Sequence, residues 1–126
     1  MTEVNRSDDC GNSPKNMFVQ ELSIALALGD IDSILGGVSD DVRWDIVGRR
    51  QVTGKAALAE QVRDQEAAEA KTVTIHHVVT HGKAGAVNGT IKLKDGRSRQ
   101  FCDVHEFTNA KGTRVRAITS YVIEST

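Results

Sequence analysis

Residues 97–124 read RSRQFCDVHEFTNAKGTRVRAITSYVIE and form two β-rich runs on either side of the polar segment 109–112. Asn, Lys and Gly in that segment are typical of a turn, so the sequence predicts a β-hairpin. In the first arm, an acid and an imidazole fall on one face between two phenyl rings, because side chains along a strand alternate between faces. That face holds Phe101, Asp103, His105 and Phe107, and the opposite face holds Cys102, Val104 and Glu106. A mostly apolar face with a few ionisable groups is typical of the wall of a ligand pocket.

The same alternation divides the second arm of the hairpin. One face groups Val115, Ala117, Thr119, Tyr121 and Ile123. We expect Ala117, Thr119 and Tyr121 to line the pocket, with the hydroxyl of Tyr121 directed into it. The alternative is that Tyr121 covers the core with its ring and keeps its hydroxyl in solvent.

The length and composition limit the class of protein. With 126 residues, of which 39% are hydrophobic, the chain fits one domain with a sizeable core. The 16 Lys and Arg nearly balance the 17 Asp and Glu, so a net charge of -1 gives no field to attract nucleic acid or an anionic membrane. No apolar run is long enough to cross a bilayer, and residues 1–16 lack the apolar segment of a signal peptide, so we expect a cytoplasmic protein.

The first part of the chain predicts a disordered tail followed by two helices. Residues 1–12 are polar and show no periodic apolar pattern that could offset the cost of ordering them. Ser13 and Pro14 are typical of a helix start, and Gly29 can end that helix in the left-handed conformation. Asp30 can then cap a short second helix. We therefore expect one domain over residues 13–126.

The rest of the chain predicts strands around a third helix. Residues 42–47 are β-rich, and residues 49–53 are candidates for a return strand beside them. The segment 55–70 has high helix propensity, with a stripe at Leu58, Val62 and Gln65. Two further β-branched runs, 72–80 and 84–93, lead through an Asp-Gly turn into the hairpin.

This order of elements predicts an α+β fold. Helices followed by strands favour a cone-shaped, curved and mostly antiparallel sheet of about six strands, four of them long, packed against three helices. A curved sheet that helices cover on one side can enclose a cavity.

In this order and in its short motifs, the chain resembles the nuclear-transport-factor-two-like superfamily, specifically its SnoaL-like and ketosteroid-isomerase-like branch. The resemblance covers residues 13–124. The motifs that carry it are LGDID at 28–32, SDDVRW at 39–44, TGK at 53–55, and FCDVHEF at 101–107 with Tyr121. The superfamily includes isomerases, cyclases, epoxide hydrolases, dehydratases and proteins without catalytic activity, so the resemblance implies a fold and leaves the activity open.

The resemblance also implies roles for single residues. The family's isomerases place an acid that donates a hydrogen bond to the substrate oxyanion four residues before a phenylalanine, and Asp103 and Phe107 match that spacing. Their carboxylate base aligns with Asp45 if a one-residue gap is allowed. Without the gap Ile46 takes that place, and alternation along the strand directs Asp45 outward. Leu22 stands where those isomerases carry an oxyanion-hole tyrosine, so steroid isomerase activity is not expected.

Asp103 and His105 are the candidate catalytic residues, with Asp45 as a third candidate. Phenyl rings around Asp103 would exclude water, raise the pKa of its carboxyl and suit it to donate or shuttle a proton. His105 is close enough along the strand to form an acid–base pair with it. A structural interpretation remains open, in which Asp103 is a hydrogen-bonded core acid and His105 a core histidine that bonds the hydroxyl of Tyr121 or Thr119.

The pocket is expected to be lined mainly by apolar and aromatic side chains, with Trp44 as a flat wall for a ring or, alternatively, as part of the core. The expected lining is Phe18, Leu22, Trp44, Ile46, Phe101, Phe107, Ala117, Thr119 and Tyr121.

Other reactive residues do not predict a site. Neighbouring His76 and His77 are expected on opposite faces of a strand, and His81 would lie roughly 13 Å from His77, so no metal site is predicted. Cys102 is on the face opposite Asp103 with no base beside it, so it is not a candidate nucleophile.

Two functions remain open. The first is cofactor-independent proton transfer, as an isomerase, cyclase or lyase acting on a small cyclic or carbonyl-bearing molecule. The second is a non-catalytic module that senses a ligand or forms dimers. Under both, we expect a homodimer through the outer face of the sheet, because the resemblance implies one and because an exposed face with Ile118 and Val122 needs covering.

Overall fold

Capping residues set the limits of the first two helices in the computed structural model, which describes residues 2–64 and 69–125. Helix α1 (Pro14–Leu28) begins after Ser13, whose side chain accepts a backbone hydrogen bond, and ends at Gly29 in the left-handed conformation with φ 72°. Helix α2 (Ile31–Gly37) follows Asp30, whose side chain caps it in the same way. Both helices begin where the sequence predicts.

The third helix packs by the stripe that the sequence predicts. Helix α3 (Lys55–Asp64) buries Leu58 and Val62. The expected continuation over 65–68, which includes Gln65, lies outside the described residues. None of the described helices has the length and apolar character that crossing a bilayer would require.

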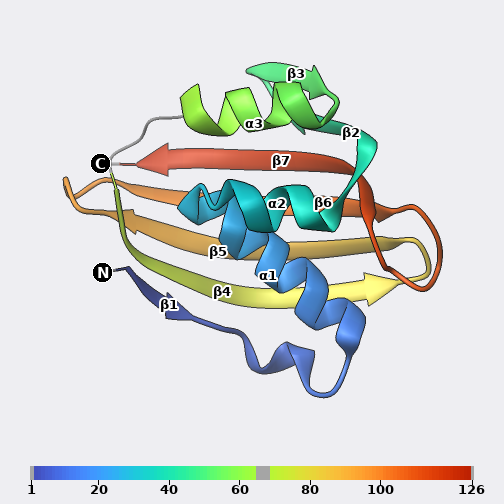
Figure 1. Cartoon of the computed structure of the whole chain (residues 1–126). Coiled ribbons are helices and arrows are strands. Elements are labelled where there is room, and N and C mark those ends of the chain that lie inside the picture. The colour runs from blue at the N-terminus through green and yellow to red at the C-terminus, as the bar shows by residue number, and fades with distance from the viewer. Residues whose placement is uncertain (1, 65–68, 126) are drawn as a thin grey trace.

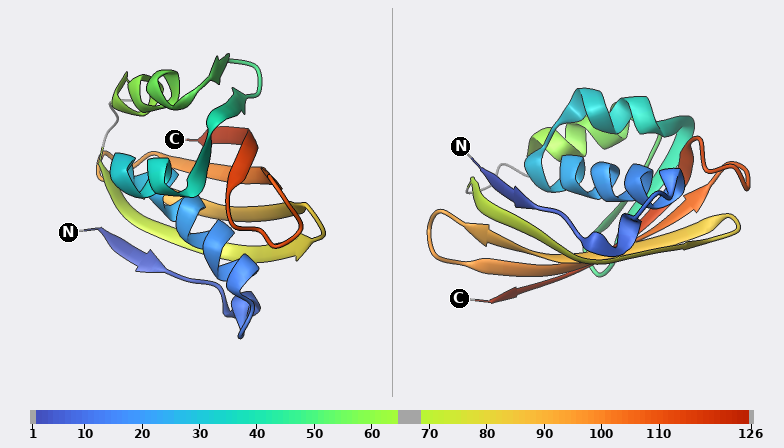
Figure 2. Two further views of the ribbon diagram at one scale, coloured as in Figure 1. Left: turned by 45° about the vertical axis from the view of Figure 1, so that its right-hand side comes forward. Right: turned by 90° about the horizontal axis from the view of Figure 1, so that it is seen from below.

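Within the described residues, seven strands form one curved sheet in the order β1-β4-β5-β6-β7-β2-β3 (Figure 1). They are β1 (Glu3–Asn5), β2 (Val38–Ile46), β3 (Arg50–Thr53), β4 (Ala70–His81), β5 (Ala84–Leu93), β6 (Ser98–Phe107) and β7 (Val115–Ser125). Strands β4 to β7 form the expected antiparallel meander, and β2 extends it in parallel with β7. The three helices lie on the concave side of the sheet (Figure 2). This arrangement confirms the predicted cone-shaped α+β fold, with one strand more than expected.

The additional strand comes from the segment that composition predicts to be a disordered tail, 1–12. Residue 1 is outside the described part of the chain, but Glu3–Asn5 pairs in parallel with Thr72–Thr74 of β4. A short 3-10 turn, Asp8–Cys10, follows and buries its cysteine, whose sulfur accepts a hydrogen bond from Gln20 at 3.2 Å. The prediction of disorder is therefore wrong in the described part. The segment is ordered by backbone pairing with the edge of β4, a contact that apolar periodicity does not report.

A β-bulge in β4 changes the placement of two histidines. His76 is an extra residue between the pairs that β4 and β5 form on either side of it. As a result, His76 and His77 are both exposed on the outer side of the sheet, where they bond Thr90 and Asn88. The expectation that they point to opposite faces is wrong for this reason.

A second bulge, in β7, reverses the expected alternation of the last strand. Arg116 is the extra residue, because Glu106 pairs with Ala117 while Phe107 pairs with Val115. Beyond the bulge, Ile118, Ser120 and Val122 face the concave side, and Thr119 and Tyr121 face outward, with Tyr121 50% exposed. Thr119 and Tyr121 are therefore not pocket residues, and Ile118 and Val122 are not on the outer face.

Large side chains fill one end of the cone. There α1 lies against β4 and β5, and the ring of Phe18 stacks on that of Phe107 with centroids 6.3 Å apart. Phe107, Val115 and Val38 are fully buried at this end. The narrow end is therefore filled by side chains, and space remains toward the C-terminal end of α1.

We predict that Gly89→Ala destabilises the fold. Gly89 lies opposite the β4 bulge, and a Cβ there would be 2.9 Å from the ring of Phe101 and in steric conflict with the backbone oxygen of Thr74. Overpacking of this kind costs about 1–3 kcal/mol, and a conflict with backbone relaxes poorly. Urea denaturation measures the loss. Gly36→Ala is the matched control, since a Cβ at Gly36 meets nothing within 4 Å; equal losses in the two variants would contradict the prediction.

Candidate functional site

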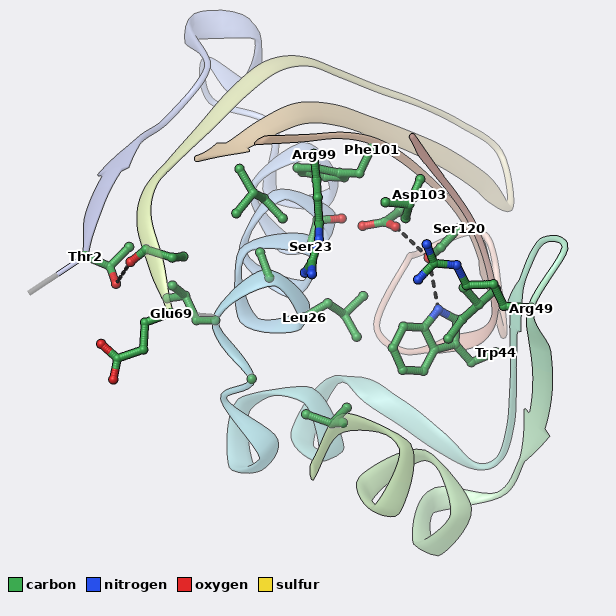
Figure 3. Close-up of a pocket in the computed structure, with 18 of the residues that line it drawn as sticks. Thr2, Ser23, Leu26, Trp44, Arg49, Glu69, Arg99, Phe101, Asp103 and Ser120 are labelled. Atoms are coloured by element: carbon green, nitrogen blue, oxygen red, sulfur yellow. Dashed lines mark hydrogen bonds between the residues drawn. The ribbon is translucent and has the colours of Figure 1, made fainter. Parts of the chain in front are cut away.

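A cavity of about 770 Å³ lies between the concave side of the sheet and the helices (Figure 3). Its apolar wall comes from α1, β2, β5, β6 and β7 and includes Leu26, Trp44, Ile46, Ile91, Phe101 and Val122. The cavity is also lined by charged side chains, which are the exposed Arg49, Asp64, Glu69 and Lys94 and the half-buried Arg99. The volume is in the range of small-molecule sites, about 300–1,000 Å³.

Asp103 is the carboxyl group of the buried wall. It is 5% exposed on β6, and its Oδ1 accepts a hydrogen bond of 2.7 Å from the hydroxyl of Ser120 on the paired strand β7. Ser120 in turn accepts a hydrogen bond of 2.9 Å from the indole Nε1–H of Trp44 on β2 (Figure 3). Three neighbouring strands therefore fix the carboxyl at the cavity wall.

The pKa of Asp103 reflects a balance of burial and hydrogen bonding. Burial raises it from the usual 3.8 to about 6, because removal of water destabilises the charged carboxylate. The hydrogen bond from Ser120 acts in the opposite direction, and the Ser23 hydroxyl does so too, although its well-formed hydrogen bond is to His105. Near pH 7 the carboxyl is mostly ionised, with about a tenth of it protonated.

His105 lies deeper than Asp103 and does not line the cavity. It is fully buried, and its Nε2 is 2.9 Å from the hydroxyl of Ser23 on α1. Burial lowers the pKa of its ring to about 3, so the imidazole is neutral at physiological pH. The structural interpretation treats His105 as a core histidine bonded to a hydroxyl. That hydroxyl belongs to Ser23, and not to Tyr121 or Thr119.

The other predicted site residues divide into those that line the cavity and those that do not. Trp44, Ile46 and Phe101 line it as expected. Asp45 is half-buried on the opposite face of β2, where strand alternation directs it, and does not reach the cavity. Leu22 and Phe107 lie instead in the packed core, half-buried Phe18 packs against that core, and Ala117 is buried on the outer face of β7.

Sequence reasoning missed the two serines that contact the candidate residues. Unbroken alternation along the second arm places Ser120 on the face opposite Thr119 and Tyr121, and it does not reveal the β7 bulge that turns Ser120 inward. Ser23 could be found from the sequence. It follows Gln20 by three residues and Val19 by four, so helical spacing places its hydroxyl on the buried side of α1.

The described residues offer acid–base chemistry rather than a metal centre. In residues 2–64 and 69–125, no group of three or more His, Cys, Asp or Glu is placed to hold a metal ion. Two cations of the cavity lining are neutralised, Arg99 by Glu124 at 2.7 Å and Lys94 by Glu69 at 2.6 Å. What remains within the buried wall is a single carboxyl whose pKa is near neutrality, as suits a group that gains and loses protons.

Stability should depend on pH through both buried groups, in opposite directions. The folded pKa of Asp103 is raised to about 6, so its contribution to the free energy of unfolding is lost as pH rises through that value. The folded pKa of His105 is lowered to about 3, so its contribution is lost as pH falls below about 6.5. Each effect is about 1.4 kcal/mol per unit of pKa difference.

We therefore predict that the stability of Asp103→Asn relative to the native sequence falls as pH is lowered from about 7 to 4, because the variant retains only the histidine effect. Urea denaturation across this range measures it. Asp45→Asn controls for loss of a carboxyl. A difference between Asp103→Asn and the native protein that stays constant with pH would contradict the assignment.

Comparison with known proteins supports the fold. A family model described as a SnoaL-like domain matches residues 19–118. A search of curated proteins finds no match. An NTF2-like protein of unknown function from Cytophaga hutchinsonii is similar with a TM-score of 0.68 and 20% identity, over 86% of this chain and 99% of that one.

Two further solved structures carry functional descriptions of their own. A putative ketosteroid isomerase from Kribbella flavida has a TM-score of 0.70 and 16% identity, over 89% of this chain and 79% of that one. An LEH-like epoxide hydrolase from M. tuberculosis has a TM-score of 0.66 and 21% identity, over 86% and 82% respectively. At these identities the likeness extends to the fold alone. Because the family model covers most of the chain, the resemblance found in the sequence is confirmed, and this protein belongs to the SnoaL-like domain family.

Proposed function

We propose that the cavity binds a small, largely apolar molecule with a carbonyl or similar polar group, and that Asp103 transfers a proton to or from it. The observation that carries this proposal is a buried carboxyl at the apolar wall of a cavity of about 770 Å³. Burial of a carboxyl in such a wall has a desolvation cost, and buried ionisable groups with shifted pKa values cluster at functional sites.

The geometry favours a reaction in which Asp103 acts first as a base. Its ionised form predominates near neutral pH, and its raised pKa makes it a stronger base than a solvated carboxylate. Trp44 and Phe101, which line the same cavity, would hold an apolar or cyclic substrate beside it. Removal of a proton next to a carbonyl and its return elsewhere is the chemistry of isomerases, cyclases and lyases, and it needs no redox group. The description of the Kribbella structure as a putative ketosteroid isomerase names a member of this class, whereas the M. tuberculosis structure is described as an epoxide hydrolase, a different acid–base reaction.

We predict that Asp103→Asn lowers turnover by about 10²–10⁴-fold, the usual contribution of one acid–base group. The fold should persist, because the asparagine oxygen can still accept the hydrogen bond from Ser120. A thermal-shift screen of ketones, epoxides and steroids identifies the ligand class, and proton exchange or product formation from the hits measures turnover. Asp45→Asn, on the opposite face of β2, is the matched control.

The screen separates the two functions that the sequence leaves open. Turnover that Asp103→Asn leaves unchanged would reject the proposed mechanism. Hits that bind in the cavity without any reaction would favour the alternative, a ligand-sensing module, in which Asp103 only orients the ligand.

We also propose that the outer face of the sheet pairs with a second copy of the chain. Large apolar side chains are exposed there on β4, β6 and β7, with Ile123 72% exposed. They are Val79, Val104, Tyr121 and Ile123. A shallow depression of about 370 Å³ lies among several of them. An apolar patch on a sheet face is typical of an interface, and a two-fold pairing would cover it on both copies at once.

We predict that Ile123→Lys shifts the protein toward monomer in sedimentation velocity across a concentration series, because it places a charge within this patch. Val47→Lys is the matched control, since Val47 is an exposed apolar residue outside the patch, between β2 and β3. A native protein that sediments as a monomer at every concentration would reject the proposal.

A further inference from the structure

We propose that His105 donates a hydrogen bond from Nε2 to the hydroxyl of Ser23, and thereby directs the Ser23 proton toward Asp103. His105 is then a positioning residue that holds Asp103 in its ionised form, ready to accept a proton. This inference rests on the proposed role of Asp103 in proton transfer and extends it to a residue that does not touch the cavity.

The neighbouring side of Asp103 shows how such an arrangement works. The indole of Trp44 can only donate, so Ser120 must accept from it at 2.9 Å. The single hydroxyl proton of Ser120 is then available for Asp103, and it lies on that bond at 2.7 Å. A donor outside the site therefore fixes the direction of a serine hydroxyl that contacts the carboxyl.

On α1, Ser23 is related to His105 as Ser120 is related to Trp44. It lines the same cavity as Asp103, it is buried, and its hydroxyl is 2.9 Å from Nε2 of His105. Its hydroxyl also favours the charged form of the Asp103 carboxyl. Ser23 thus contacts the imidazole and shares the cavity wall with the carboxyl, and the direction of its proton depends on which ring nitrogen of His105 carries hydrogen.

The surroundings of the ring decide between the two tautomers. Among the described residues, Nδ1 of His105 is the one buried side-chain nitrogen or oxygen without a hydrogen-bond partner. If Nδ1 carried the proton, an N–H group would be buried with no acceptor, and orphaned donors are rarer in proteins than under-satisfied acceptors. Ser23 would then have to donate its hydroxyl proton to Nε2, and that proton would point away from the ionised carboxylate of Asp103. With the proton on Nε2, that N–H has the Ser23 hydroxyl as its acceptor, and Nδ1 is left only as an under-satisfied acceptor.

The remaining groups around Asp103 do not replace this role. From the elements packed against it, β7 contributes Ser120, β2 contributes Trp44 and α1 contributes Ser23. Among the charged residues of the cavity, Arg99 and Lys94 are paired with carboxylates. The other charged residues, Arg49, Asp64 and Glu69, are exposed. Two hydroxyl donors, each oriented by a nitrogen donor behind it, are the polar contacts that favour the charged carboxyl.

This arrangement assigns Asp103 a role that differs from the one its family position implies. The isomerases that the chain resembles use an acid there to donate a hydrogen bond to an oxyanion. An acid that receives two hydroxyl protons is held in the acceptor form and serves as the base. The substrate class that fits is a compound with an acidic C–H group rather than one that needs a second hydrogen-bond donor at this position.

Nuclear magnetic resonance of the full-length protein tests the inference without a substrate. The ¹⁵N shifts of the His105 ring identify the protonated nitrogen, and we expect hydrogen on Nε2 and none on Nδ1. The ¹³C shift of the Asp103 carboxyl, assigned by its loss in Asp103→Asn, follows its titration. We expect Ser23→Ala to raise the pKa of Asp103 by about one unit, because one donor to the charged form is lost. Ser98→Ala, which removes a hydroxyl bonded to Ser125, is the matched control.

Replacement of the imidazole affects the pKa of Asp103 differently for the two tautomers. In His105→Leu the Ser23 hydroxyl has no ring nitrogen to bond. If it already donates to Asp103 in the native protein, as we infer, the pKa of Asp103 does not fall, and His105→Gln, which retains an N–H donor, keeps the native value. If Ser23 instead donates to His105 in the native protein, His105→Leu releases that proton to Asp103 and the pKa falls.

A proton on Nδ1, or a pKa of Asp103 that Ser23→Ala leaves unchanged, overturns the inference. Both measurements stand even if the leucine variant does not fold. Because neither depends on turnover, failure of this inference is distinguishable from failure of the proposed function.

Discussion

The pairing of β6 with β7 determines what faces the cavity. Asp103 lies directly opposite Ser120 because one extra residue, Arg116, shifts the alternation of β7 by one position. Without that bulge, Thr119 and Tyr121 would face the helices, and Ser120 would be on the outer surface. The same bulge directs Ile118 into the core, where it is fully buried opposite His105. One inserted residue thus supplies both the donor to the carboxyl and part of the packing behind it.

Asp103 and His105 are polar groups buried where an apolar core normally excludes such groups. Burial disfavours the charged carboxylate of Asp103 and the charged imidazole of His105 alike, and it moves their pKa values toward the neutral form of each. Hydrogen bonds from Ser120, with Trp44 behind it, partly reverse the effect for Asp103. Trp44 therefore has two roles, since its ring lines the cavity and its N–H fixes a serine. Such sites lower stability in exchange for reactivity, as is common where function requires a buried polar group.

The sequence predicts local structure correctly where a single residue determines the backbone conformation. Ser13 and Gly29 set the limits of α1 because a cap and a left-handed residue act within one turn of helix. The inward position of Asp103 followed from strict alternation along β6, which contains no bulge at that point. Asp45 likewise faces away from the cavity, as alternation alone predicts.

What the sequence did not reveal depends on contacts between distant segments. A bulge appears only when two strands are paired, so neither the outward turn of Tyr121 nor the inward turn of Ser120 could be derived from one strand. The order of the first residues likewise depends on β4, some seventy residues later in the chain. Composition measures how much apolar surface a segment can bury, and β1 is ordered chiefly by backbone hydrogen bonds.

The position of that first strand has a consequence for how copies of the chain can meet. The described sheet has a short strand at each border, β1 with three residues and β3 with four. β1 pairs with residues 72–74 of the twelve-residue β4, and further along the same edge Ser7 donates to the carbonyl of His76 and Asp9 accepts from the N–H of Val78, so backbone groups that would otherwise invite strand addition from another molecule are already bonded. Sideways growth into fibrous assemblies is thereby hindered, while the broad convex surface stays open to contact.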